Sequence, residues 1–302
     1  MNKRLLILLI LVPMLSCREG GEVIVPDNYA EPYAGVSTIK VENYLNRVYI
    51  DLLGREPLDA ELKEDVAFLR EGELGSEQRE KLVSKLMTDT QTREGDSSYQ
   101  IAYYKRVYEL TKARLLEGVS NEEISRQRGI FRFAFVSDSL NGNQIGMLRN
   151  QLLIDKLDML RESEIEYREG SIHIDEVYRR MLDNFFYDEI NMNTINFIRA
   201  CFDNLFFRQP TQAEFDQSFP IIEYNSASSL FGQSASTKDE YIHILLSSAE
   251  FYEGMIRWVY VSLLAREPSS EEVKEQMDAF FLDKNLQTVQ QSLLISDEYA
   301  NF

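Results

Sequence analysis

The chain has 302 residues, and its 50 acidic side chains against 32 basic ones give it a formal net charge of −18 at pH 7. So acidic a protein repels nucleic acid, which we therefore exclude as a partner. The two histidines are far apart and the two cysteines form no Cys-x-x-Cys pattern, so we expect no metal site and no cofactor.

The first 16 residues have the pattern of a secretory signal peptide. Lys3 and Arg4 precede an apolar run over residues 5–12, and a small residue precedes Cys17. The apolar run is too short to cross a bilayer. Residues 17–40 contain several Pro and Gly and little periodicity, so we expect them to form a flexible tether that begins at Cys17.

The end of this segment, Leu15-Ser16-Cys17, resembles a bacterial lipobox, which implies that Cys17 is lipidated and anchors the protein to a membrane. An ordinary signal peptide that happens to end at a cysteine is the alternative. Arg18, where inner-membrane lipoproteins have Asp, resembles an outer-membrane sorting signal. Residues 18–22 loosely resemble the acidic export tags of Bacteroidota surface lipoproteins. We expect an outer-membrane protein and leave open whether it faces the periplasm or the outside.

A motif that ends in Arg-x-Pro occurs three times, over residues 49–57, 202–210 and 260–268. Apolar residues at helical spacing precede each copy, and a Glu follows each Pro by four residues. Internal repetition of this kind indicates a repeated structural unit. The residues that define it are Arg55, Pro57 and Glu61, then Arg208, Pro210 and Glu214, then Arg266, Pro268 and Glu272.

Each copy predicts a helix, a tight corner and a second helix. The first helix has to end near Arg-x-Pro, because the residue before a proline is pushed out of the helical region. Thr211 and Ser269 are spaced from the following Glu as in a capping box, whereas in the first copy we expect Asp59 to be the cap. We interpret the three arginines as ties to helix-end carbonyls or to the nearby Glu, with a ligand-facing Arg as the alternative.

These corners resemble a known domain when they are taken with the downstream pattern Leu-Leu-x-Ser-x-Glu-Tyr/Phe. That pattern occurs over residues 245–251 and 294–299, with a degraded version over 86–92. The similarity is to a helical domain of unknown function from bacterial cell-surface and secreted proteins, related in pattern to the phycobilisome linker domain. The resemblance implies an interaction or scaffolding module and supplies no catalytic residues.

We therefore predict an all-α fold in one elongated or two-lobed body. The expected division is repeat one at 41–95, a non-repeat helical region at 96–190, repeat two at 191–253 and repeat three at 254–302.

The second repeat carries an apparent insertion, a Ser- and Ala-rich segment over residues 219–236. Its apolar residues Tyr224, Leu230 and Phe231 are candidate partner contacts, because loops inserted into repeats often carry the contacts. The alternative is that the segment folds back and buries them.

Three functions remain open. The first is a non-enzymatic outer-membrane lipoprotein that serves as an accessory or scaffolding subunit for another envelope protein. The second is a glycan-binding lipoprotein beside an outer-membrane transporter, which would need an exposed aromatic patch such as Tyr103, Tyr224 and Phe231. The third is a hydrolase that uses a pair of carboxylates. No nucleophile elbow, phosphate loop or His-Glu-x-x-His motif is present, and we favour the first.

Overall fold

The computed structural model describes residues 32–92 and 97–302. The predicted signal peptide, Cys17 and the first part of the tether lie outside the described residues. The described chain forms fifteen helices and one pair of short strands, so the predicted all-α fold is confirmed. None of the helices in these two ranges is both long and apolar enough to cross a bilayer.

The elements follow one another along the chain with short connections. They are α1 (Thr38–Leu53), α2 (Asp59–Glu71), α3 (Ser76–Thr88), α4 (Tyr99–Leu115), α5 (Asn121–Leu140), α6 (Gln144–Arg168), α7 (Ile174–Leu182), α8 (Phe185–Ile190), α9 (Thr194–Phe206), α10 (Gln212–Tyr224), β1 (Ser228–Leu230), β2 (Gln233–Ala235), α11 (Lys238–Leu246), α12 (Ala249–Leu264), α13 (Ser270–Asp283), α14 (Leu286–Leu294) and α15 (Asp297–Ala300).

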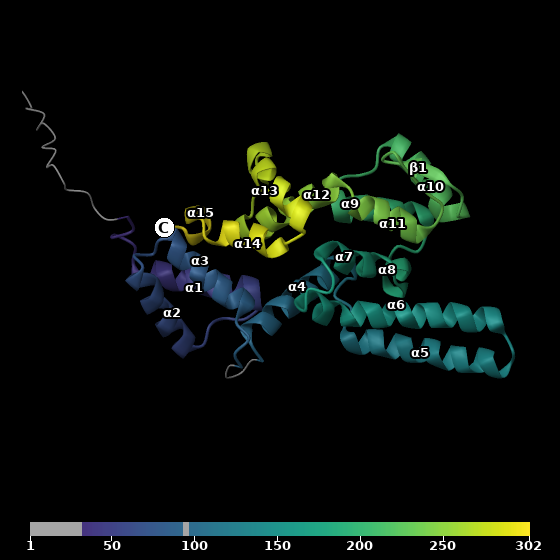
Figure 1. Cartoon of the computed structure of the whole chain (residues 1–302), viewed down its shortest axis with the longest axis horizontal. Coiled ribbons are helices and arrows are strands. Elements are labelled where there is room, and N and C mark those ends of the chain that lie inside the picture. Colours follow the sequence, from purple (N-terminus) through teal and green to yellow (C-terminus); the bar gives the residue numbers. More distant parts are fainter. Residues whose placement is uncertain (1–31, 93–96) are drawn as a thin grey trace, which may run out of the picture.

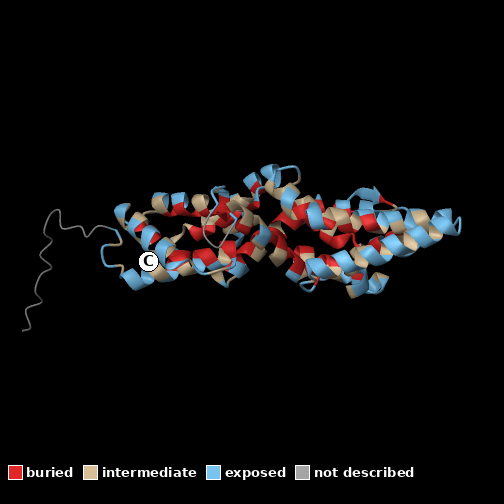
Figure 2. Ribbon diagram, turned by 90° about the horizontal axis from the view of Figure 1, so that it is seen from below, coloured by how far each residue is buried: buried red, intermediate tan, exposed pale blue. Residues whose placement is uncertain are grey.

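The helices form an elongated body with two lobes (Figure 1). The first lobe contains α1 to α3 with α13 to α15, and the second contains α7 to α11 with the strand pair. Helices α4 and α12 join the lobes, since α4 contacts α1, α3, α6 and α7, while α12 contacts α9, α13, α14 and α15. The buried side chains line the space between the helices of both lobes, whereas α5 and α6 project as a long, largely exposed hairpin (Figure 2).

The first and third repeats pack against each other through residues that lie 216 to 252 positions apart in the chain. Tyr44 Oη donates to the Leu294 carbonyl at 3.2 Å, and Tyr299 Oη donates to Asp51 at 2.6 Å. The guanidinium of Arg47 donates to the carbonyls of Tyr299 and Leu263 at 2.8 and 2.9 Å. The two ends of the described chain therefore meet in the first lobe.

The second and third repeats share a helix. The expected boundary between residues 253 and 254 falls inside α12, which closes the second repeat and opens the third. Gly254 lies in mid-helix where α12 crosses α9, and a Cβ there would come within 2.0 Å of the Leu205 carbonyl oxygen. Glycine is thus required by the close approach of two helices rather than by a boundary.

The apparent insertion in the second repeat is more ordered than the sequence indicates. Helix α10 continues through Pro220 to Tyr224, and the segment that follows forms an antiparallel pair in which Ser228 faces Ala235. Phe231 and Gly232 form its turn, both with positive φ. The prediction of a loop over 219–236 is therefore wrong for residues 219–224, which are helical, and for the two short strands.

Cys201 lies in the core on α9 and is fully buried, as its place on the apolar face predicts. Burial raises the pKa of its thiol to about 12, so the side chain is a small core residue with little thiolate.

Candidate functional site

The three corners share one backbone geometry. The residue before each Arg adopts the left-handed conformation, with φ of 75° at Gly54, 56° at Phe207 and 54° at Ala265. Its amide N–H closes the preceding helix by donating to the carbonyl four residues earlier. The chain then reverses into the Arg-x-Pro segment.

Each corner arginine forms a bidentate pair with the Glu six residues later. Arg55 meets Glu61 at 2.8 and 2.9 Å. Arg208 and Arg266 repeat the arrangement with Glu214 and Glu272. In every copy the same Glu also accepts the N–H of the N-cap residue at 2.7 Å. One carboxylate therefore both caps the second helix and holds the arginine in place.

These contacts lower the pKa of the corner glutamates. Hydrogen bonds from Arg208 lower the pKa of Glu214 to about 2, and those from Arg266 do the same for Glu272. Burial opposes the shift at Glu61, but hydrogen bonds from Arg55 and Tyr99 still hold its pKa at about 2. All three carboxylates are therefore ionised partners of an arginine and make poor general acids or bases at neutral pH.

A second glutamate, which the sequence analysis left without a role, completes two of the corners. Glu250 in the first turn of α12 pairs with Arg208, and Glu298 in the first turn of α15 pairs with Arg266 at 2.6 and 2.7 Å. These residues belong to the downstream Leu-Leu-x-Ser-x-Glu pattern, so that pattern and the Arg-x-Pro corner form one structural unit.

The first copy departs from this plan in two ways. The helix equivalent to α12 and α15 is α4, which begins after Ser98. The degraded pattern over 86–92 covers the last residues of α3, which ends at Thr88, and the start of the connection to α4. Tyr99 of α4 donates to Glu61 at 2.6 Å. Leu58, and not the predicted Asp59, is the N-cap of α2, where the Glu61 carboxylate accepts the Leu58 N–H and no side chain caps from the other side.

The predicted partner contacts in the second repeat do not form a single exposed patch. Tyr224 is 66% exposed and Phe231 is 37% exposed, but Leu230 is fully buried and belongs to the core. The Phe231 ring packs near the rings of Phe202 and Phe206. The segment folds back on α9, and Leu230 is corrected from a contact to a core residue.

Tyr103 is also buried, which removes it from the aromatic patch expected of a glycan site. Its hydroxyl donates to Gln290 at 2.6 Å in the first lobe. Helix α4 packs against α1, α3, α6 and α7, so it is covered on more than one face. Helical spacing alone therefore could not show whether Tyr103 faces solvent or a neighbouring helix.

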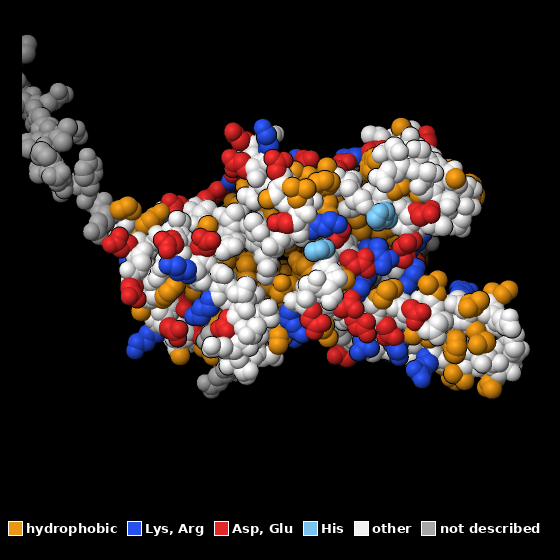
Figure 3. Space-filling view, viewed as in Figure 1, with side chains coloured by type: hydrophobic (Ala, Val, Ile, Leu, Met, Phe, Trp, Pro, Cys, Tyr) orange, Lys and Arg blue, Asp and Glu red, His pale blue; other side chains and the backbone are white. Residues whose placement is uncertain are grey.

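The exposed apolar surface lies instead on the end of the α5–α6 hairpin, residues 129–152, which we call the distal hairpin. Large apolar side chains cover its surface where it projects from the body (Figure 3). They follow helical spacing on both helices, and several are more than 70% exposed. They are Ile130, Phe133, Val136 and Leu140 on α5 and Ile145, Leu148 and Leu152 on α6.

The distal hairpin also differs in charge from the rest of the protein. Its only charged residues are Arg132, Asp138 and Arg149. Asp138 is occupied, because it accepts hydrogen bonds from Asn143 and Asn150 at 2.9 and 2.8 Å. Both arginines are exposed and form no ion pair with any residue in the described part of the chain. A protein of charge −18 thus carries a neutral to basic, apolar tip.

The base of the hairpin is fixed by ion pairs. Arg128 on α5 binds Asp158 on α6 through two hydrogen bonds of 2.5 and 2.7 Å, and Lys156 reaches Asp183 beyond α7 at 2.7 Å. Asp158 is thus half-buried and paired with Arg128. The tip therefore projects from a braced base.

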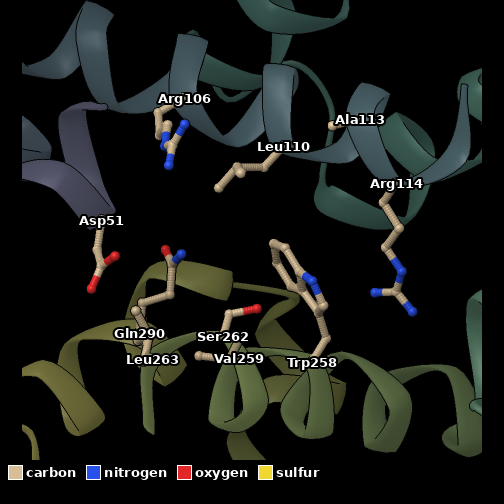
Figure 4. Close-up of a pocket in the computed structure, with 10 residues that line it drawn as sticks. All are labelled: Asp51, Arg106, Leu110, Ala113, Arg114, Trp258, Val259, Ser262, Leu263 and Gln290. Carbon is tan, nitrogen blue, oxygen red and sulfur yellow. The ribbon is translucent and has the colours of Figure 1, made fainter. Parts of the chain in front are cut away.

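A second feature is a cavity of about 430 Å³ between α4 and α12 (Figure 4). Leu110 and Trp258 approach it from opposite walls, and Arg106 and Asp51 lie at one end. Burial raises the pKa of Asp51 above its usual value, although the hydrogen bond from Tyr299 opposes the shift. The lining residues are Asp51, Arg106, Leu110, Ala113, Arg114, Trp258, Val259, Ser262, Leu263 and Gln290.

Carboxylates line some of the hollows in the described chain. The cavity between α4 and α12 has a single carboxylate, that of Asp51. A smaller hollow of about 360 Å³ beside Arg208 contains Glu250, Glu253 and Glu267, and each of these is paired with an arginine. Across residues 32–92 and 97–302, no three His, Cys, Asp or Glu side chains are grouped so that they could hold a metal ion.

Comparison with known proteins adds no assignment, because no family model, no curated protein and no solved structure matches this chain.

Proposed function

We propose that this chain is a non-enzymatic outer-membrane lipoprotein that acts as an accessory or scaffolding subunit and binds its partner through the distal hairpin. The lipid anchor is Cys17, and the repeats form the rigid body that carries the hairpin. The single observation that supports the partner-binding role is the apolar, braced hairpin tip.

Exposed apolar area of this extent is costly in water unless it is covered. Seven large apolar side chains gather on the distal hairpin. Contiguous apolar patches on soluble proteins mark interaction sites, and each such side chain contributes about 1.5–3 kcal/mol when it is fully buried. The tip therefore supplies enough favourable energy to offset the cost of association.

The partner we infer is a different envelope protein with an apolar groove and an acidic rim. The apolar stripes fit the floor of such a groove, and the unpaired Arg132 and Arg149 fit carboxylates at its edge. A second copy of this chain is a less favourable occupant, because the two acidic bodies repel each other.

The test is photo-crosslinking in cells that express the full-length protein at its native level. A photoreactive residue is placed at Leu148 on the tip, whose side chain is 74% exposed. The matched control carries it at Leu282 on α13, which is similarly exposed, at 82%. In parallel, Leu140→Glu combined with Ile145→Glu introduces charge on the tip, and Leu282→Glu does so on the control surface.

We expect one protein of different mass to be crosslinked from position 148 and not from position 282. This crosslinked product should be lost in the Leu140→Glu, Ile145→Glu double variant and retained in Leu282→Glu. A crosslinked dimer of this chain would assign the tip to self-association instead. Crosslinking to lipid alone, or no crosslink at all, would overturn the docking role.

The anchor is tested by Cys17→Ser. We expect this variant to leave the membrane fraction, because no acyl chain can be attached, while the melting temperature of the purified body stays unchanged. The measurement is membrane fractionation followed by thermal unfolding. A Cys17→Ser protein that remains fully membrane-bound would contradict the lipid anchor.

A further inference from the structure

The cavity between α4 and α12 is a separate site, because none of its lining residues belongs to the distal hairpin. Four elements build it: α1 supplies Asp51, α4 supplies Arg106 and Leu110, α12 supplies Trp258, and α14 supplies Gln290 (Figure 4). Helices from the first and third repeats thus converge on it, so it exists only when the two repeats are docked.

The charged and polar groups of this cavity leave donors without acceptors. Arg106 Nε is buried and has no hydrogen-bond partner in the described chain. Gln290 accepts from Tyr103 through Oε1, which leaves its amide N–H groups free of any bond to the described residues. A buried donor without a partner, such as Arg106 Nε, favours an acceptor that comes from outside the chain.

The balance of charge also favours an anion. The lining contains two guanidinium groups and one carboxylate, in a protein whose overall charge is strongly negative. The carboxylate, Asp51, is already engaged because it accepts the hydroxyl of Tyr299 at 2.6 Å. Arg114 is partly engaged, since it donates to the Asn204 carbonyl and lies over the rings of Phe207 and Trp258. The charge of Arg106 acts on Asp51, but its buried Nε has no hydrogen-bond partner in the described chain, so Arg106 is the cation with donor capacity left for a ligand.

We propose that this cavity binds a small organic anion, with its carboxylate or phosphate held by Arg106 and Gln290 and a flat apolar portion between Leu110 and Trp258. A planar guanidinium suits either group, and an indole ring suits a flat apolar surface. The volume of about 430 Å³ lies within the range of small-molecule sites, which is roughly 300–1,000 Å³.

Trp258 makes the proposal directly measurable, because it is the only tryptophan in the chain. Its fluorescence is followed while phenylacetate, phenyl phosphate or neutral phenylacetamide is added to the full-length protein in detergent. The test variant is Arg106→Gln, and the matched control is Arg126→Gln, which removes an exposed arginine on α5 that pairs with Glu123 and lines neither the cavity nor the distal hairpin. Gln290→Glu is a second variant, since it keeps the acceptor for Tyr103 and adds a negative charge to the cavity.

We expect a saturable change in Trp258 fluorescence with at least one anion, and binding at least tenfold weaker to phenylacetamide. Arg106→Gln and Gln290→Glu should each weaken anion binding at least tenfold, whereas Arg126→Gln should leave it unchanged. The ratio of phenylacetate to phenyl phosphate affinity distinguishes the two ligand classes. No saturable response to either anion, or equal binding of the neutral amide, or an unaffected Arg106→Gln protein, would overturn the site.

Discussion

At the scale of single residues, the position before each corner arginine shows how one backbone angle constrains the side chain. All three copies need positive φ there, yet only the first uses glycine, at Gly54. Phe207 and Ala265 adopt the same conformation with a Cβ, which costs an L-residue about 1–2 kcal/mol. The fold is thus held in two copies against local strain, and the Arg–Glu pairs and caps of the corner offset it.

This strain predicts that Ala265→Gly stabilises the protein by about 0.5–1 kcal/mol, because glycine adopts the left-handed conformation at this exposed position without strain. The greater conformational entropy of glycine in the unfolded chain cancels part of this stabilisation. Gly54→Ala should destabilise it, since the new Cβ adds the same strain and meets Arg106 Cδ at 3.3 Å. Urea unfolding of both variants measures the two changes. Ala265→Gly below wild type would show that the corner is not strained.

At the scale of elements, the Arg-x-Pro corner joins three helices through one arginine. In the second and third repeats the arginine binds the Glu that caps the helix after the corner and the Glu that begins the helix closing the repeat. The Arg-x-Pro motif and the downstream Glu therefore recur together because they are in contact in the folded protein. The number of residues between them differs between copies because different elements lie between them.

The corner should also set the acid limit of stability. The pKa of Glu214 is about 2 in the folded protein, below the ordinary value of about 4.3 for an unfolded chain. Its contribution is present above that ordinary value and is lost as the pH falls toward 2. Because the pair is partly exposed to solvent, we expect only about 1 kcal/mol.

We therefore predict that Glu214→Gln lowers stability at pH 7 and flattens the loss of stability between pH 4.5 and 2. Asp216→Asn on the exposed face of the same helix is the control, and it should follow the wild-type curve. Urea unfolding at several pH values gives the comparison. Parallel curves for wild type and Glu214→Gln would contradict the role of the pair.

At the scale of the whole molecule, the docking of the first repeat on the third closes the first lobe and forms the cavity between α4 and α12. Arg47 lies at this junction, where it donates to two carbonyls of the third repeat and stacks over the Tyr299 ring at 4.2 Å. Its side chain is exposed, but the two hydrogen bonds it donates are partly buried, so its removal leaves those carbonyls without their side-chain partner.

Arg47→Ala should accordingly lower the free energy of unfolding by about 1–2 kcal/mol, since hydrogen bonds to charged groups are worth more than neutral ones, while water replaces part of them at an exposed side chain. Calorimetry should show a lower melting temperature for the first lobe. Arg126→Ala removes an exposed arginine that pairs only with Glu123, and its melting temperature should not move. Equal effects of the two variants would mean that the repeats do not depend on this junction.

The sequence by itself determined the class of fold, the three corners and the core position of Cys201. These depend on local rules, since helical spacing, proline and capping act over a few residues. It could not show that Glu250 and Glu298 complete the corners, that Leu230 and Tyr103 are buried, or that α12 serves two repeats. Those facts are contacts between residues far apart in the chain.

The distal hairpin also shows that burial could not be predicted from the sequence, because here apolar side chains stay exposed. Phe133, Ile145 and Leu148 lie in the region predicted as non-repeat helix, and their apolar side chains are of the kind that a helix buries in a core. Only the tertiary structure shows that no other part of the described chain covers them. Apolar periodicity predicts that a helix has a face to bury, but which face finds a partner within the chain is decided by how the helices pack.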